Sequence, residues 1–226
     1  MRAALKGLRD DTAETVAQYL LAAEMAEDDE QAYEYARAAR SLAARIGVVR
    51  EVAGVAAYRA GKWAEALAEL RAARRLTGRN DYLPVMADAE RALGRLDRAL
   101  ALVRSDEAQD LDRAGQIELR IVESGIRRDQ GRPDAAVLVL RVPELTDGRQ
   151  RPWSARLLYA YGEALLAAGD VEAARDAFAR AADADTEDET GAAERLDELD
   201  GITIDDLGDD DEDDDDDEEP EADSDE

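Results

Sequence analysis

Residues 158–181 read LYAYGEALLAAGDVEAARDAFARA, and this stretch contains the unit that decides the fold. Gly162 is a small residue inside one helical stretch, and Gly169 ends that stretch. Ala174 follows five residues after Gly169, and Phe178 follows four residues later on one face of a second helical stretch. The segment therefore predicts a helix pair, and we expect Gly162 and Ala174 to face each other across it.

The same unit occurs at three earlier places in the chain. The marker glycines, which are separated by 33, 37 and 38 residues, are Gly61, Gly94, Gly131 and Gly169. The small and large residues expected to pack within the pairs are Gly54, Ala66, Ala87, Ala99, Ser124, Ala136, Gly162, Ala174 and Phe178. A period in this range is typical of a solenoid, in which stacked helix pairs form an extended binding surface rather than a catalytic pocket.

Helical periodicity predicts an all-α fold, an α-solenoid of about five antiparallel helix pairs followed by one capping helix. The expected helices cover residues 11–26, 32–46, 48–60, 63–76, 81–93, 95–104, 112–130, 133–141, 153–168, 171–184 and, for the capping helix, 187–199. Residues 105–112 and 142–152 are expected to be connectors. Residues 137–142 are the one β-like run, which we interpret as a buried helical segment because the repeat places a helix there.

The last part of the chain differs sharply from the rest in composition. From Asp205 to Glu226, 17 of 22 residues are Asp or Glu, so this segment cannot bury an apolar face and is predicted to be disordered. The predicted organisation is an N-terminal segment (1–11), a helical repeat domain (12–200) and a polyacidic tail (201–226). The net charge of −27 argues against direct binding to nucleic acid or to an anionic membrane.

The residue types that are missing also exclude functions. The chain has no cysteine and no histidine, which excludes a disulfide, a thiolate metal site and a Cys nucleophile, and removes the commonest general base. We expect neither a cofactor nor a metal. There is no signal-peptide pattern and no run approaching the ~18 apolar residues of a membrane span, so a cytoplasmic location is expected. The strong preference for arginine over lysine suggests a bacterial genome rich in GC.

The repeated unit resembles the tetratricopeptide repeat (TPR). That family has a large residue, Leu, Gly and Tyr in the first helix and Ala and Phe in the second. Residues 158–181 match this pattern well. Residues 50–73 match at the small positions, with Ala57 in place of Tyr and Leu70 in place of Phe.

The other repeats match less closely. Glu90 and Arg127 stand where the family has an aromatic residue, and residues 16–39 align only loosely. The resemblance covers roughly residues 12–200. It implies a non-enzymatic module that binds a partner protein or peptide in a groove lined by the first helix of each pair.

The groove positions follow from the repeat register. They are Glu51, Val55, Tyr58, Arg59, Asp88, Arg91, Ile121, Arg128, Arg156, Tyr159 and Glu163. Arg59, Arg91 and Arg128 occupy near-equivalent places, so they form either a ladder that holds carboxylates or phosphates, or surface charges paired with acidic neighbours. The family's C-terminal carboxylate mode is not expected, because the single asparagine, Asn80, lies outside these positions.

The aromatic residues have two interpretations. Tyr58, Tyr159 and Trp153 are either anchors for a partner or half-buried packing residues. Trp63 follows a glycine turn and is expected to be structural.

A calcium loop is a further pattern to weigh. The acidic residues Asp183, Asp185, Glu187 and Glu194 have EF-hand spacing, but Asp188 stands where that loop needs glycine, so calcium binding is not favoured.

The leading hypothesis is thus a protein-interaction module, and not an enzyme. The alternative is an acidic-tail protein, a nucleic-acid mimic or a chaperone for basic proteins, in which the solenoid only presents the tail. A third element is intramolecular: the tail can dock in the arginine-lined groove of its own body. The partner and the oligomeric state do not follow from the pattern.

Overall fold

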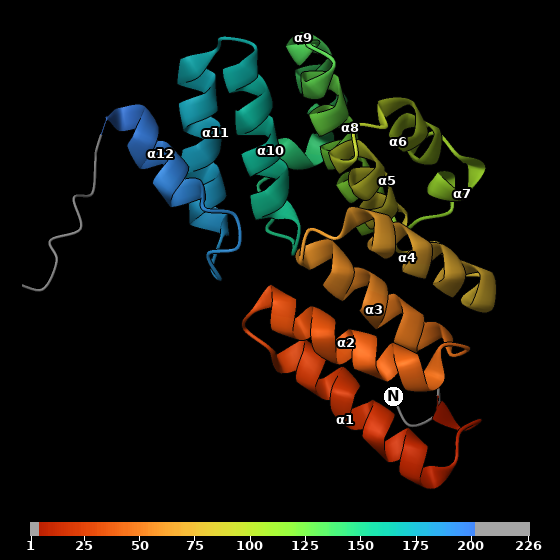
Figure 1. Cartoon of the computed structure of the whole chain (residues 1–226). Coiled ribbons are helices and arrows are strands. Elements are labelled where there is room, and N and C mark those ends of the chain that lie inside the picture. Colours follow the sequence, from red (N-terminus) through yellow and green to blue (C-terminus); the bar gives the residue numbers. More distant parts are fainter. Residues whose placement is uncertain (1–4, 202–226) are drawn as a thin grey trace, which may run out of the picture.

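The computed structural model describes residues 5–201, and in this range the chain is all-α, as predicted. Figure 1 shows the helices following one another in chain order along a stack. Their bounds are α1 Asp10–Met25, α2 Asp29–Ala43, α3 Gly47–Arg59, α4 Trp63–Thr77, α5 Leu83–Ala92, α6 Leu96–Val103, α7 Asp106–Gln109, α8 Arg113–Asp129, α9 Pro133–Leu140, α10 Ser154–Ala167, α11 Val171–Ala184 and α12 Ala192–Asp200. Most of the predicted tail (201–226) lies outside the described residues, as do residues 1–4.

The helices form five antiparallel pairs: α1/α2, α3/α4, α5/α6, α8/α9 and α10/α11. The second helix of each pair also packs against the first helix of the next, as α2 does on α3 and α9 on α10. The helix α12 packs on α11, with Ala192, Leu196 and Leu199 joining the apolar cluster of the last pair. It therefore caps the end of the solenoid, as predicted.

Several predicted boundaries differ from the structure. The helix predicted at residues 32–46 is α2, Asp29–Ala43, which begins and ends three residues earlier. The connector at residues 105–112 contains the short helix α7, and the connector at 142–152 contains a 3₁₀ turn, Pro143–Leu145. The capping helix begins at Ala192 rather than at residue 187. The Asp185 side chain accepts hydrogen bonds from the backbone N–H groups of Glu189 and Thr190, which bends the chain and delays the helix.

The four marker glycines end helices as their spacing predicts. Gly61, Gly94, Gly131 and Gly169 have φ values of 69°, 70°, 68° and 85°. This left-handed conformation is costly for a residue that carries a Cβ atom. Each glycine therefore allows the chain to reverse between the two helices of a pair.

All nine residues expected to pack within the pairs are buried. A Cβ atom added to Gly162 would lie 2.9 Å from Phe178, and one added to Gly54 would lie 2.6 Å from Leu70. The three atoms nearest to a Cβ atom built on Gly162 all belong to Phe178, one helical turn beyond Ala174 along α11. The glycine therefore makes room for the large residue of the second helix.

Two buried glutamates connect neighbouring pairs. Glu69 on α4 accepts hydrogen bonds from Arg40 on α2 (2.7 Å) and from Arg50 on α3 (2.5 Å). Glu90 on α5 is fully buried and is bonded by Arg71 of α4 and by Arg95. A buried carboxylate needs such partners, because burying it unpaired is very unfavourable.

Nothing among residues 5–201 has the helix length and apolar character needed to cross a membrane.

We predict that Gly162→Leu lowers the free energy of unfolding by about 1–3 kcal/mol, because the new side chain overpacks the contact with Phe178. The measurement is urea unfolding followed by circular dichroism. Ala167→Leu is the matched control, since Ala167 is an exposed residue of the same helix. Equal stability of the two variants would contradict the packing described above.

We predict that Glu90→Gln lowers the free energy of unfolding by about 1.5–3 kcal/mol, because hydrogen bonds to a charged acceptor are lost in a buried site. Thermal and urea unfolding measure the change. Glu24→Gln, at an exposed position of α1, should alter stability by less than about 0.5 kcal/mol. An effect of Glu90→Gln as small as that of Glu24→Gln would argue that the buried ion pairs do not hold the second and third pairs together.

Candidate functional site

A groove with a volume of about 490 Å³ runs across the first helices of four consecutive pairs: α3, α5, α8 and α10. Apolar residues form much of its lining, among them Pro84, Val85, Ile121, Val122 and Ala160. The helices are neighbours because α5 packs on α8 and α8 packs on α10 (Figure 1). The turn before α12 contributes Glu189 and Thr190 at one end of the groove.

The groove contains most of the residues that the repeat register places there. Those that line it are Tyr58, Asp88, Arg91, Ile121, Arg128, Arg156, Tyr159 and Glu163. Three others do not. Arg59 forms an ion pair with Asp29 on α2 at 2.6 Å, Glu51 is buried 3.9 Å from Arg79, and Val55 packs in the core between α4 and α5. Of the three arginines in the predicted ladder, Arg59 therefore lies outside the groove.

The charged residues of the groove are paired with one another from helix to helix. The Arg91 Nε donates to Asp129 at 2.7 Å, and Arg128 Nη1 donates to Glu163 at 2.6 Å. Arg156 Nη2 donates to Glu118 at 2.6 Å. Each of these three bonds joins the first helix of one pair to the first helix of a neighbouring pair. Of the two interpretations given for these arginines, the structure therefore agrees with pairing to acidic neighbours and not with a ladder that is free to hold carboxylates or phosphates.

A tyrosine makes the corresponding contact between the first helices of the second and third pairs. The Tyr58 hydroxyl on α3 donates to Asp88 on α5 at 2.5 Å. Burial, followed by this carboxylate acceptor, raises the pKa of Tyr58 above its usual value. Burial likewise raises the pKa of Tyr159. Burial acts to lower the pKa of Arg91, but the hydrogen bonds to Asp129 and Asp88 outweigh it and raise the pKa.

Gly125 also lines the groove, and the sequence analysis did not identify it as a groove residue. A Cβ atom on Gly125 would lie 2.8 Å from the Arg91 guanidinium carbon. The guanidinium therefore lies directly against α8, within reach of Asp88 and Asp129. The only signal in the sequence is a glycine inside a helical pattern, which indicates a close approach without naming the group that approaches.

Two polar atoms in this groove have no hydrogen-bond partner in the protein: the Ser124 hydroxyl and the Arg128 Nε. The repeat pattern treats Ser124 only as a small packing residue. Among the buried side-chain polar atoms of this groove, these two are left without a partner inside the protein.

The aromatic candidates separate into two groups. Tyr159 lines the groove and packs edge-on against Phe178, with ring centroids 5.4 Å apart. Trp63 packs against Tyr58 and is structural, as expected. Trp153 packs against the cluster of the last pair and does not line the groove.

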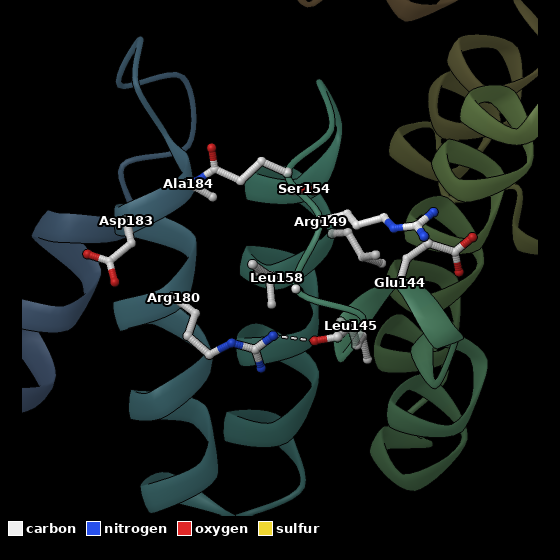
Figure 2. A pocket seen from close by; sticks show the side chains of 11 residues that line it. Glu144, Leu145, Arg149, Ser154, Leu158, Arg180, Asp183 and Ala184 are labelled. Atoms are coloured by element: carbon white, nitrogen blue, oxygen red, sulfur yellow. Dashed lines mark hydrogen bonds between the residues drawn. The ribbon is translucent and has the colours of Figure 1, made fainter.

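A second, smaller cavity of about 180 Å³ lies between α10, α11 and the connector that precedes α10 (Figure 2). Figure 2 shows Arg180 reaching from α11 toward the backbone carbonyl of Leu145, to which it donates a hydrogen bond. Asp147 accepts hydrogen bonds from Arg151, which lower the pKa of Asp147 to about 2. These contacts hold the connector in place, so we assign this cavity a structural role.

The acidic residues with EF-hand spacing do not form a metal site. Both Asp185 oxygens accept hydrogen bonds from Glu189 and Thr190, and Asp188 takes a positive φ of 53°. Across the described range 5–201, no three His, Cys, Asp or Glu residues are grouped to hold a metal ion.

The fold and the groove define a helical-pair repeat protein, an α-solenoid with a largely apolar groove whose arginines are paired with carboxylates. No family model matches the chain, and no curated protein matches it.

We predict that Gly125→Ala displaces the Arg91 guanidinium while keeping the fold. Alanine favours the helix by about 1 kcal/mol over glycine, and the end of an arginine side chain can move away from the added methyl group. In NMR spectra, the Nε–H of Arg91 should exchange faster with solvent once its bond to Asp129 is lost. The Nε–H of Arg156 should not change, since it donates to Glu118. Unchanged exchange at Arg91 would show that Gly125 does not position it.

Proposed function

We propose that this protein is a non-enzymatic interaction module of the tetratricopeptide type that binds a segment of a partner protein or peptide in the groove across α3, α5, α8 and α10. The observation that carries the proposal is the continuity of this groove over four successive first helices, with an apolar lining. Solenoids characteristically use such surfaces to bind extended partners. Aromatic residues, represented by Tyr58 and Tyr159, are common anchors at such interfaces.

The chemistry of the groove supports binding better than catalysis. Arg91, Arg128 and Arg156 hold Asp88, Glu163 and Glu118 in ion pairs, so these carboxylates are poorly placed to act as general bases. The absence of histidine and cysteine from the sequence points the same way. We also infer a cytoplasmic, bacterial protein that binds neither nucleic acid nor membranes directly, from its composition and its net charge of −27.

The test compares two alanine-to-glutamate variants of α10. Ala160→Glu adds bulk and charge inside the groove, and Ala167→Glu makes the same change at an exposed position outside it. Partners captured on the intact protein are identified, and peptides that tile them are measured by fluorescence anisotropy. We expect Ala160→Glu to weaken binding by at least tenfold, equivalent to about 1.4 kcal/mol, and Ala167→Glu to have no effect.

Equal binding by the two variants would place the binding surface elsewhere and would refute the proposal. Thermal unfolding of both variants verifies that the comparison is made between folded proteins.

The composition of the tail favours one alternative function, in which the acidic tail itself binds the partner. With 17 acidic residues among its last 22, the chain suits a basic partner, in which case the solenoid only presents the tail. Deletion of residues 205–226 separates the two functions. Partner binding survives the deletion if the groove binds, and is lost if the tail binds.

Docking of the tail in its own groove has less support. Arg91 and Arg128 are engaged with acidic neighbours, and Arg59 lies outside the groove. The charged residues that line the groove are three arginines and four carboxylates, a formal charge of −1 that repels an acidic ligand.

A further inference from the structure

The Ser124 hydroxyl is unusual for its position in the repeat. The equivalent small residues of the other pairs are Gly54, Ala87 and Gly162, so close packing needs only a small residue and not a hydroxyl. Ser124 is 1% exposed, lines the groove, and its Oγ has no hydrogen-bond partner in the protein. Burial of an unpaired hydroxyl is unfavourable, so this group calls for an explanation.

Arg128 presents a second unpaired donor one helical turn further along α8. Its Nη1 donates to Glu163, but its buried Nε has no partner. Residues four apart lie on the same face of a helix, so Ser124 and Arg128 face the groove together. Each of the two residues thus brings one buried donor without a protein partner to the same face of α8.

The charge around these donors determines the kind of acceptor. The positive charge of Arg128 is already balanced by Glu163, which also pairs with Arg195 at 3.1 Å. A carboxylate or phosphate bound here would bring a further negative charge close to Glu163, in a groove whose lining already carries −1. An uncharged carbonyl oxygen accepts the same hydrogen bonds without this repulsion.

The surroundings of the two donors are apolar. Ile121 and Val122 lie on the same helix, Val85 on α5 and Ala160 on α10, and all four line the groove. A ligand that fills this space gains by burying apolar surface.

We infer that the groove binds an uncharged, largely apolar stretch of the partner chain, and that Ser124 and Arg128 bind one of its carbonyl oxygens. This inference rests on the proposed function and specifies the chemistry of its ligand. Ser124 and Arg128 are thereby specificity residues, and the ion pairs around them shape the groove without attracting a charged ligand.

The test uses a phage-displayed library of random peptides selected against the full chain, with the selected peptides then synthesised. We expect sequences with apolar residues and few charges. Their Kd should change by less than about twofold between 0.05 and 0.5 M salt, since few exposed ion pairs form on binding. On binding, the Arg128 Nε–H resonance should shift in NMR spectra.

Two conservative variants probe the donors directly. Ser124→Ala and Arg128→Lys should each weaken binding by about three- to tenfold, the usual value of one hydrogen bond. Ser124→Ala should leave the thermal midpoint unchanged or raise it, because it removes an unpaired buried hydroxyl. The matched controls are Ser41→Ala and Arg98→Lys, at exposed positions outside the groove, and they should bind like the wild type.

Two kinds of contrary result would separate this inference about the ligand from the proposal that the groove binds a partner. Selected peptides that are acidic and sensitive to salt, or that bind Ser124→Ala and Arg128→Lys as tightly as the wild type, would overturn this inference while leaving groove binding intact. Peptides unaffected by Ala160→Glu, or a selection that yields no binding peptide, would overturn groove binding itself.

Discussion

The close packing of a small residue on the first helix of a pair against the second helix is the constraint on which the rest of the solenoid depends. At Gly162 the place of the missing side chain is taken by Phe178, and at Gly54 it is taken by Leu70. Protein interiors are close-packed, so this contact fixes how near the two helices of a pair approach. Each pair then offers an apolar side to the next pair, and the first helices come to lie side by side along one surface.

The groove on that surface is held in shape by polar contacts between successive first helices. Arg128 bonds Glu163 across 35 positions of the chain, and Arg156 bonds Glu118 across 38. These separations are close to one repeat, so the ion pairs follow the period of the solenoid. Because they are satisfied within the protein, they contribute to the geometry of the groove more than to its attraction for charged ligands. Recognition is left to apolar surface and to the few donors that remain unpaired.

The less regular repeats are stabilised in a different way from the regular one. Where the repeat pattern expects an aromatic residue, the third pair has Glu90, fully buried and bonded to Arg71 and Arg95. In this pair a network of hydrogen bonds and ion pairs surrounds the buried Glu90. Such a network is directional, since each charge needs its partner in place. Departure from the pattern therefore marks a change in how the pairs are joined, not the absence of a pair.

The sequence by itself determined the ten helices of the five pairs, the glycine turns within four of these pairs, and the pairing itself. These features depend on local rules, namely the helical period and the left-handed glycines, so Gly61 and Gly169 could be assigned without a structure. It also located most of the groove, because the repeat register puts equivalent residues on equivalent faces.

Only the tertiary structure decided which groups meet across neighbouring helices. It places Arg59 beside Asp29 instead of in the groove, sets the Arg91 guanidinium against Gly125, and turns the Ser124 hydroxyl from a packing detail into a candidate ligand contact. These contacts join residues that are distant in the chain, and they depend on how each pair is rotated relative to the next. Local periodicity does not encode that rotation, because many small packing contacts set it jointly.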